Sequence, residues 1–294
     1  MDTTRSNDPG RPAARSCCAP AAPAGGEPPA PPLPGAPDEI RAVVRNRYAT
    51  YAEGKSVASG GCCCAGGADS DLLSTLGYSE DQAAAVPEGA NLGLGCGNPL
   101  AHADLRPGET VLDLGSGAGI DCFLAAREVG PAGRVIGVDM TPAMLDRARA
   151  TGARAGITNV EFRLGEIENL PVADASVDAL ISNCVVNLSP DKPRVFREAW
   201  RVLRPGGRLL LSDLVLVREL DHRLRGDVSL YVGCVAGASL RDEYLRLIEE
   251  AGFHPVEVMA EDGYDVGAEN LEDGSPEQAA FAAVRSVKIR AVKP

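Results

Sequence analysis

Residues 111–125, VLDLGSGAGIDCFLA, join one apolar run to another through a turn that holds three glycines. The run VLDLG (111–115) predicts a buried strand, and the segment 120–130 predicts a helix that ends at Gly130. Glycines at a strand-to-helix turn let the backbone pass close beneath a ligand. Because such turns are common, the stretch predicts an α/β fold but does not by itself identify the ligand.

Strand and helix signals continue to alternate after this turn. One helical run begins with Thr141 as a cap and Pro142 in its first turn. The alternation predicts a parallel sheet with helices on both faces. Near the end of the chain, a strand at 286–292 is expected to return antiparallel beside a strand at 255–261. The other strands are predicted at 134–140, 160–166, 177–183 and 208–216, and further helical regions around 192–203, 222–234 and 239–252.

Composition and charge limit the possible functions. The chain has 294 residues and a net charge of −12, and its sequence has no basic stripe that could neutralise phosphates, so we expect no nucleic-acid partner. The first residues lack the apolar core of a secretion signal, and no run approaches the roughly 18 apolar residues of a membrane helix. We therefore expect a cytoplasmic protein without a membrane partner. Residues 1–37 contain ten prolines and few large apolar side chains, which predicts a disordered arm.

Two acidic residues sharpen the interpretation of the glycine turn. Asp139 closes the second predicted strand 20 residues after Gly119, where its carboxylate can accept hydrogen bonds from both ribose hydroxyls of a nucleoside. Asp113 lies inside the end of the first strand, and the turn lacks the full GxGxxG spacing used for pyrophosphate. An anionic pocket suits a cationic ligand, and S-adenosylmethionine fits it better than a dinucleotide does. The alternative interpretation is that Asp113 only caps a turn and Asp139 only caps the next helix.

Three cysteines are expected around the carboxyl edge of the sheet, where open α/β proteins bind ligands. Cys184 directly follows the fourth strand in ISNCVVNL, Cys96 lies in GLGCGNP before the first strand, and Cys234 lies in YVGCVAGA after the fifth. The chain has nine cysteines, and a compartment that keeps thiols reduced argues against a disulfide scaffold. Nothing in the chain matches a CxxC…CxxC zinc spacing.

Three converging thiolates would form a soft, trigonal site that selects a thiophilic centre such as trivalent arsenic. Arsenite would bind as a neutral pyramid whose free lone pair attacks the sulfonium methyl group, so the protein's contribution would be positioning and no general base would be required. The simpler interpretation of each cysteine is a small buried hydrophobe, and we assign Cys122 in this way.

The sequence also resembles known families. Over residues 105–216, including LRPGG (203–207), it is similar to class I S-adenosylmethionine-dependent methyltransferases. This implies a Rossmann-like, seven-stranded sheet with an antiparallel last strand, an N-terminal lid and a C-terminal substrate-binding extension. In that family the residues after the third strand, here Gly165, Glu166 and Ile167, edge the adenine. The cofactor-binding residues that we assign are Asp113, Gly115, Ser116, Gly117, Asp139, Met140, Gly165, Glu166, Ile167 and Asn183.

A narrower resemblance rests on VLDLGSGAGIDCFLA, GEIENLP, ISNCVVNLSPDK and the Gly-Cys contexts at 96 and 234. From about residue 38 to about 260 the chain looks like arsenite S-adenosylmethionine methyltransferases. That family binds trivalent arsenic through cysteines matching Cys96, Cys184 and Cys234.

The same resemblance implies an additional upstream cysteine, which forms a disulfide that helps return the oxidised arsenic product to the trivalent state. Here that position is a triplet, Cys62, Cys63 and Cys64, of which we take Cys63 and Cys64 as candidates. The triplet could also be an adventitious metal-binding patch. An external thiol reductant, glutathione or thioredoxin, and a monomeric enzyme are expected.

The predicted organisation has four parts: the arm (1–37), a lid with the cysteine cluster (38–104), the S-adenosylmethionine-binding domain (105–216) and an arsenic-binding region with the final strands (217–294). Two other functions stay open at this point. The first is a methyltransferase that acts on a carbon, oxygen or nitrogen of a small metabolite, because one scaffold carries many substrates. The second is a thiol protein that sequesters a metalloid without transforming it, although storage needs no nucleoside pocket.

Overall fold

The structure is a computed structural model that describes residues 32–54, 70–264 and 276–294. Strands and helices alternate along most of the chain, as the sequence predicts. The strands are β1 (Thr110–Leu114), β2 (Arg134–Asp139), β3 (Val160–Leu164), β4 (Val177–Asn183), β5 (Leu203–Leu216), β6 (Val256–Gly263) and β7 (Val284–Val292). The helices are α1 (Pro37–Ala52), α2 (Ser70–Thr75), α3 (Glu80–Ala85), α4 (Ile120–Val129), α5 (Pro142–Arg154), α6 (Lys192–Val202), α7 (His222–Arg225), α8 (Val228–Val232), α9 (Arg241–Glu250) and α10 (Pro276–Phe281), with short 3-10 turns η1 (Pro99–His102) and η2 (Val186–Leu188).

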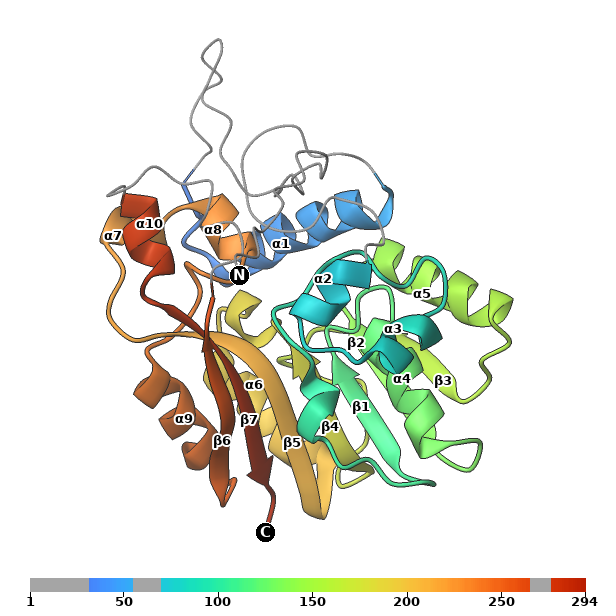
Figure 1. The fold of residues 1–294 in the computed structure, drawn as a ribbon. Coiled ribbons are helices and arrows are strands. Elements are labelled where there is room, and N and C mark those ends of the chain that lie inside the picture. Colours follow the sequence, from blue (N-terminus) through green and yellow to red (C-terminus); the bar gives the residue numbers. More distant parts are fainter. Residues whose placement is uncertain (1–31, 55–69, 265–275) are drawn as a thin grey trace, which may run out of the picture.

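All seven strands form one sheet in the order β3-β2-β1-β4-β5-β7-β6. The first five pair in parallel, whereas β7 lies antiparallel between β5 and β6 (Figure 1). The predicted seven-stranded α/β sheet with an antiparallel last strand is therefore confirmed. Because parallel strands point their carboxyl ends to one edge, the turns after β1, β2, β3, β4 and β5 gather there.

Successive residues of the central strands pack into different cores. Val111 of β1 belongs to the cluster that contains α4 and α5 residues such as Leu145. Leu112, the next residue, belongs to the cluster that contains Phe196 of α6 and Ile248 of α9. Helices therefore cover both faces, which explains why the strands read as nearly continuous apolar runs instead of alternating ones.

Three local expectations differ from the structure. The sequence predicts the fifth strand at 208–216, whereas β5 already begins at Leu203, and its register to β4 shifts between the partners of Val177 and Ala179. The helical region predicted around 222–234 is two short helices, α7 and α8. Thr141 occupies the N-cap of α5 without a side-chain capping bond, and its backbone N–H donates to Asp139 Oδ1 at 2.7 Å.

Helix α1 lies across the carboxyl edge of the sheet (Figure 1). Pro37 occupies its first turn together with acidic residues, which suits the positive end of the helix dipole. Arg147 of α5 donates to the Ala52 carbonyl at 3.0 Å, which fastens the end of α1. Near its start, Arg41 Nε donates to Glu168 Oε1 at 3.2 Å. Both ends of α1 are thus bonded to elements that surround this edge.

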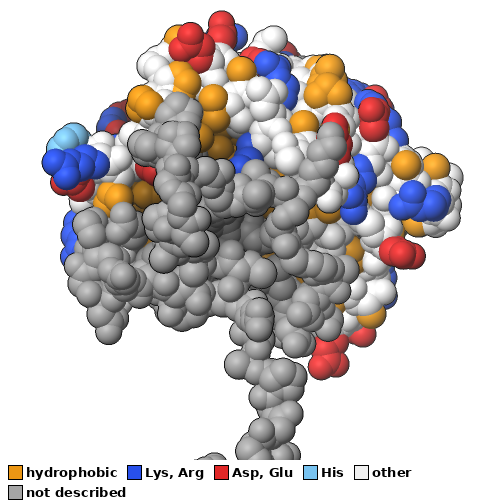
Figure 2. Space-filling model, turned by 90° about the horizontal axis from the view of Figure 1, so that it is seen from above, with side chains coloured by type: hydrophobic (Ala, Val, Ile, Leu, Met, Phe, Trp, Pro, Cys, Tyr) orange, Lys and Arg blue, Asp and Glu red, His pale blue; other side chains and the backbone are white. Residues whose placement is uncertain are grey.

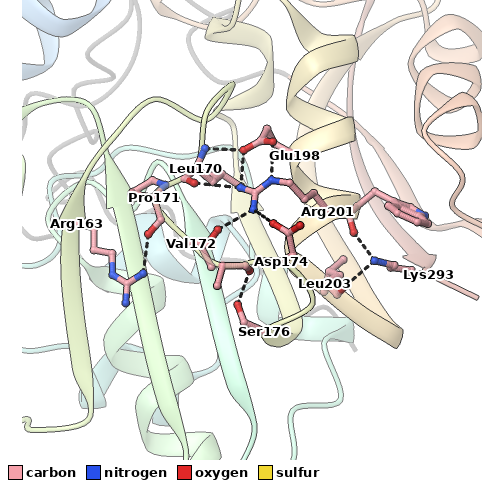
Figure 3. A network of polar contacts seen from close by, with 12 residues as sticks. Arg163, Leu170, Pro171, Val172, Asp174, Ser176, Glu198, Arg201, Leu203 and Lys293 are labelled. Carbon is pink, nitrogen blue, oxygen red and sulfur yellow. Dashed lines mark hydrogen bonds and ion pairs between the residues drawn. The ribbon is translucent and has the colours of Figure 1, made fainter.

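The connection after β3 is held in place by Arg201 of α6 (Figure 3). Its guanidinium donates to the carbonyls of Leu170 and Val172 at 3.1 and 2.8 Å. Glu198 accepts from the same guanidinium at 2.7 Å and from the Leu170 N–H at 2.8 Å. These bonds tie the segment that carries Glu168 to α6.

We expect replacement of Arg201 by Met to lower the free energy of unfolding by about 1–3 kcal/mol, because two carbonyls lose their donor while the apolar stem is kept. Urea unfolding of both proteins measures the change. Arg197→Met, on the exposed side of the same helix, is the matched control and should be nearly neutral. Equal stability of the Arg201 variant and the wild type would contradict this assignment.

The face seen from the α1 side carries acidic, basic and hydrophobic side chains interspersed over the described residues (Figure 2). Many of the charges form ion pairs, such as Arg225 with Glu219 at 3.0 Å. In the described ranges, none of the helices combines the length and apolar character needed to cross a membrane.

Candidate active site

The glycine turn after β1 is fastened to the end of β2. The Gly117 N–H donates to Asp139 Oδ2 at 2.9 Å. Gly115 has a φ of +66°, and a Cβ at this position would lie 2.5 Å from Val185, so glycine is required. The Ser116 hydroxyl is buried and has no hydrogen-bond partner among the described residues. A buried polar atom without a partner beside a pocket indicates where a ligand can bind.

A pocket opens above this turn, and α1 contributes Arg41, Val44 and Tyr48 to its wall. Glu166, which was assigned to the cofactor, does not line it; its carboxylate lies 3.6 Å from Arg41 Nε. Nine of the ten residues that we assigned to the cofactor from the sequence do line it: Asp113, Gly115, Ser116, Gly117, Asp139, Met140, Gly165, Ile167 and Asn183.

Three buried carboxylates give the pocket its electrostatic character. Asp113, Asp121 and Asp139 are at most 9% exposed, and all three line the pocket. Burial raises the pKa of each of them, that of Asp121 to about 6, and the neighbouring charge of Asp121 raises the pKa of Asp113 further. The Cys122 thiol donates to Asp113 Oδ2 at 3.2 Å. Crowded carboxylates disfavour an anionic ligand and favour a cationic one.

Asn183, at the end of β4, joins this acidic pocket to the loop that carries Cys96. Its Nδ2 donates to Asp121 Oδ2 at 3.1 Å and to the Gly97 carbonyl at 2.7 Å. Its Oδ1 accepts the Cys96 N–H at 3.1 Å. The Tyr78 hydroxyl donates to Asp121 Oδ1 at 2.8 Å. The side-chain amide of Asn183 therefore holds both the Asp121 carboxylate and the loop that carries Cys96.

The three cysteines that were expected to converge lie together at the carboxyl edge. The sulfur atoms of Cys96 and Cys184 and a carboxylate oxygen of Asp213 are within 4.8 Å of one another. The Cys234 thiol donates to the Cys184 carbonyl at 2.8 Å. The Ser212 carbonyl accepts the Cys184 N–H at 2.8 Å and the Cys96 thiol at 3.6 Å. Strand β5 thus supplies the acceptor that holds two of the cysteines.

Burial favours the protonated thiol at Cys96 and Cys184. Burial raises the pKa of Cys96 to about 11 and the pKa of Cys184 well above its ordinary value. A soft electrophile that forms covalent bonds to sulfur would replace these protons. Cys122 of α4 is fully buried in the core, which matches the small hydrophobe expected there.

Backbone strain accompanies two of the cysteines. Cys184 has a φ of +59° and Cys234 a φ of +66°, values that residues with a side chain rarely adopt. Strain of this kind persists where surrounding structure imposes it, and it clusters at functional sites. Glycine would adopt these φ values without strain. The presence of cysteine at both positions therefore indicates that the thiol groups serve a function.

Gly97 holds the Cys96 loop close to β5. A Cβ at Gly97 would lie 2.1 Å from Ser212 Oγ. We therefore expect Gly97→Ala to displace the loop, to cost about 1–3 kcal/mol of stability and to impair binding of a thiophilic ligand at Cys96. Thermal unfolding and titration of the thiols with arsenite measure these effects. Gly35→Ala, where a Cβ meets open space, is the control; wild-type behaviour of both variants would contradict the expectation.

Several residues of the site were not singled out in the sequence. Arg41, Tyr48, Asp121 and Glu168 line the pocket, Tyr78 donates to Asp121, and Asp213 lies near the sulfur atoms of Cys96 and Cys184. Asp121 carried a usable signal, since it follows the glycine turn by two residues. The others carry no local motif. Cys62, Cys63 and Cys64 lie outside the described residues, as does most of the 1–37 arm.

A sequence model of the methyltransferase domain family matches residues 105–252, which is half of the chain. The sheet order, the glycine turn and the acidic pocket together place the chain in the class I S-adenosylmethionine-dependent methyltransferases. Geranyl diphosphate methyltransferase, a solved structure with a TM-score of 0.55 and 22% identity over 66% of this chain and 82% of that one, shares the fold.

Relatives of higher sequence identity identify the family within this class. The arsenite methyltransferase of Halobacterium salinarum is 49% identical over 88% of this chain and 68% of that protein. The chain belongs to the arsenite methyltransferase family. The human arsenite methyltransferase is 37% identical, but this chain covers only 46% of its length. The solved arsenic(III) S-adenosylmethionine methyltransferase of Chlamydomonas reinhardtii is 34% identical, with a TM-score of 0.59 over 76% of this chain and 73% of that one.

The pocket fits S-adenosylmethionine on the chain's own chemistry. Asp139 offers a carboxylate for the ribose hydroxyls, and Ser116 offers an unpartnered hydroxyl. Asp113 and Asp121 would offer carboxylates to the ammonium and sulfonium groups. When bound, S-adenosylmethionine supplies an electrophilic methyl group on a positively charged sulfur.

Cofactor binding should release protons. In the free protein the raised pKa values keep part of the Asp113 and Asp121 pair protonated near neutral pH, and an arriving cation lowers both values. The bound state then holds fewer protons, so affinity should rise with pH between about pH 5 and 7 and level off above. Calorimetry in buffers of different protonation enthalpy measures this release. Affinity that is independent of pH, or proton uptake, would contradict the expectation.

Proposed function

We propose that this protein methylates trivalent arsenic, supplied as arsenite or as its thiol conjugate, while Cys96, Cys184 and Cys234 hold the arsenic atom. The observation that carries the proposal is the placement of the thiols at the acidic pocket: Cys184 lines the pocket, Cys96 lies beside it and the Cys234 thiol contacts the Cys184 carbonyl. Soft sulfur ligands match trivalent arsenic. The arsenite methyltransferases among the relatives support the same substrate.

Ligation by three thiols needs no external base. Each thiol proton can leave with one hydroxyl of arsenite as water, which yields a neutral, pyramidal arsenic bound to three sulfurs. This route suits Cys96 and Cys184, whose pKa values are raised by burial. The protein's task is then to hold the arsenic lone pair in line with the methyl group, and positioning of this kind contributes a large part of many rate enhancements.

The cofactor would be held by the residues that line the pocket. Asp139 would accept from the ribose, Gly165 and Ile167 would edge the adenine, and Met140 would pack beside them. Glu166 would act indirectly, through its ion pair with Arg41. The fold around these residues is that of S-adenosylmethionine-dependent enzymes.

Residues 38–104 would form a lid over the site, and residues 217–294 would add Cys234 and the final strands. The placement of Tyr48 supports this part of the proposal, because it lines the pocket and packs against the cluster that contains Cys184 and Cys234. An external thiol, glutathione or thioredoxin, would supply the two electrons that return the oxidised arsenic product to the trivalent state. One of Cys62, Cys63 and Cys64 would relay them.

Chromatographic speciation of arsenic tests the function. The purified protein is incubated with arsenite, S-adenosylmethionine and excess thiol, and methylated arsenic is the expected product. If S-adenosylmethionine binds and arsenite stays unmethylated, the acceptor is another small molecule. If arsenite binds but S-adenosylmethionine does not, the protein sequesters the metalloid instead.

A further inference from the structure

A buried carboxylate lies against the thiols and has no part in the function described so far. Asp213 follows Ser212, whose carbonyl holds two of the cysteines, and it is 1% exposed. One of its carboxylate oxygens lies within 4.8 Å of the sulfur atoms of both Cys96 and Cys184. An arsenic atom bonded to these sulfurs would therefore lie close to a negative charge.

Three donors from different parts of the chain hold this carboxylate in place. Asp213 Oδ1 accepts from Asn187 Nδ2 at 2.8 Å and from the Leu214 N–H at 2.9 Å. Its Oδ2 accepts from the Tyr244 hydroxyl at 2.8 Å. A fixed, hydrogen-bonded charge needs little reorganisation during a reaction, which is what makes electrostatic stabilisation effective.

Above neutral pH the Asp213 carboxylate is mostly ionised. Burial raises its pKa to about 6, while the hydrogen bonds and the charge of Lys192 oppose a larger rise. Burial of a charge is costly, and an apolar residue would pack the same space without that cost. Anchoring β5 to α9 alone is therefore a weak reason for an acid at this position.

Methyl transfer moves a positive charge toward Asp213. The arsenic lone pair forms the bond to the methyl carbon, the bond from carbon to sulfonium breaks, and its electron pair stays on the departing sulfur. The sulfur becomes a neutral thioether, and the arsenic, which was neutral with three sulfur ligands, becomes positive. The charge thus leaves the neighbourhood of the nucleoside pocket and appears between the cysteines.

We propose that Asp213 stabilises the positive charge that develops on arsenic during methyl transfer. The inference rests on the proposed function. In this assignment the cysteines bind the arsenic atom, and Asp213 does not bind it but stabilises the transition state. Such a group speeds the reaction because its interaction is stronger in the transition state than in the ground state.

Asp213→Asn tests this role, because the amide keeps the shape and one acceptor while it removes the charge. In the absence of S-adenosylmethionine, the affinity of the variant for arsenite, measured by titration of the thiols, should stay within about threefold of the wild-type affinity. Single-turnover methyl transfer at a pH above neutral should fall by about 10- to 30-fold, as expected for partial charge at short range. Asp178→Asn, at the opposite end of the sheet beside Thr110, is the matched control and should leave both unchanged.

A second variant separates the effect of the Asp213 charge from the effect of the hydrogen bonds that hold its carboxylate in place. Tyr244→Phe removes a donor and keeps the carboxylate, so methyl transfer should fall by less than about threefold. The proposal is overturned if Asp213→Asn transfers methyl at the wild-type rate, if its arsenite binding falls as much as its rate, or if Tyr244→Phe loses as much rate as Asp213→Asn. Absence of methylation by the wild type would be a different result, because it would contradict the proposed function itself.

Discussion

Arsenic methylation is lost in Cys184→Ser, with an expected fall in rate of at least about 1,000-fold, or roughly 4 kcal/mol in the barrier. The hydroxyl of serine is a hard ligand that binds trivalent arsenic poorly, so the atom would lose the sulfur ligand that lies within 4.8 Å of the Cys96 sulfur. Chromatographic arsenic speciation after incubation with S-adenosylmethionine and excess thiol measures the loss. The strained backbone at this position is unchanged, because serine and cysteine share a Cβ.

The matched control for this prediction is Cys122→Ser. Cys122 is fully buried within α4, and a serine hydroxyl can replace its bond to Asp113. Methylation should therefore stay within a few-fold of the wild type, with S-adenosylmethionine affinity as a second readout. Retained methylation in Cys184→Ser would contradict the three-thiol site, whereas equal loss in both variants would point to a general effect on folding.

Asp139→Ala should weaken S-adenosylmethionine binding by about 2–3 kcal/mol, or roughly 30- to 150-fold in Kd, because the variant loses a charged acceptor for the ribose. It also leaves the N–H groups of Gly117 and Thr141 without the carboxylate that accepts them. Calorimetric titration measures the affinity. Asp146→Ala, on the exposed face of α5, should bind normally.

The alternative interpretation of Asp139, a cap for the next helix, makes a different prediction. If Asp139 were only a cap, its replacement would lower the free energy of unfolding by about 1 kcal/mol and would leave the affinity for S-adenosylmethionine nearly unchanged. A change in Kd below about threefold, together with a lower melting temperature, would therefore assign Asp139 to the helix and not to the ligand. The structure shows its bond to the Thr141 N–H, so both readouts are needed.

Features that depend on neighbours in the sequence were predictable. The glycine turn, the acid at the end of the second strand and the apolar strand runs each specify a local structure. The rule that ligands bind at the carboxyl edge of a parallel sheet then brings Cys184 toward Cys96. That rule predicts a shared edge, and the structure puts the two sulfur atoms within 4.8 Å of each other.

Features that depend on distant pairs were not predictable in this way. Arg41 meets Glu168 across 127 residues of sequence, and Asn183 meets Tyr78 across 105. Glu166 illustrates the limit, because its place after the third strand matches the family pattern, while only the folded chain shows that its carboxylate lies 3.6 Å from Arg41 Nε.

The sequence by itself predicted the sheet, an acidic glycine turn suited to a nucleoside and three cysteines at the carboxyl edge, because strand periodicity, turn chemistry and residue type act locally. Only the tertiary structure decided that Asp121 shares the pocket with two other acids and that Asp213 lies against the thiols. The physical reason is that a side chain's pKa and its electrostatic effect depend on burial and on charges a few ångströms away in space, which no spacing along the chain specifies.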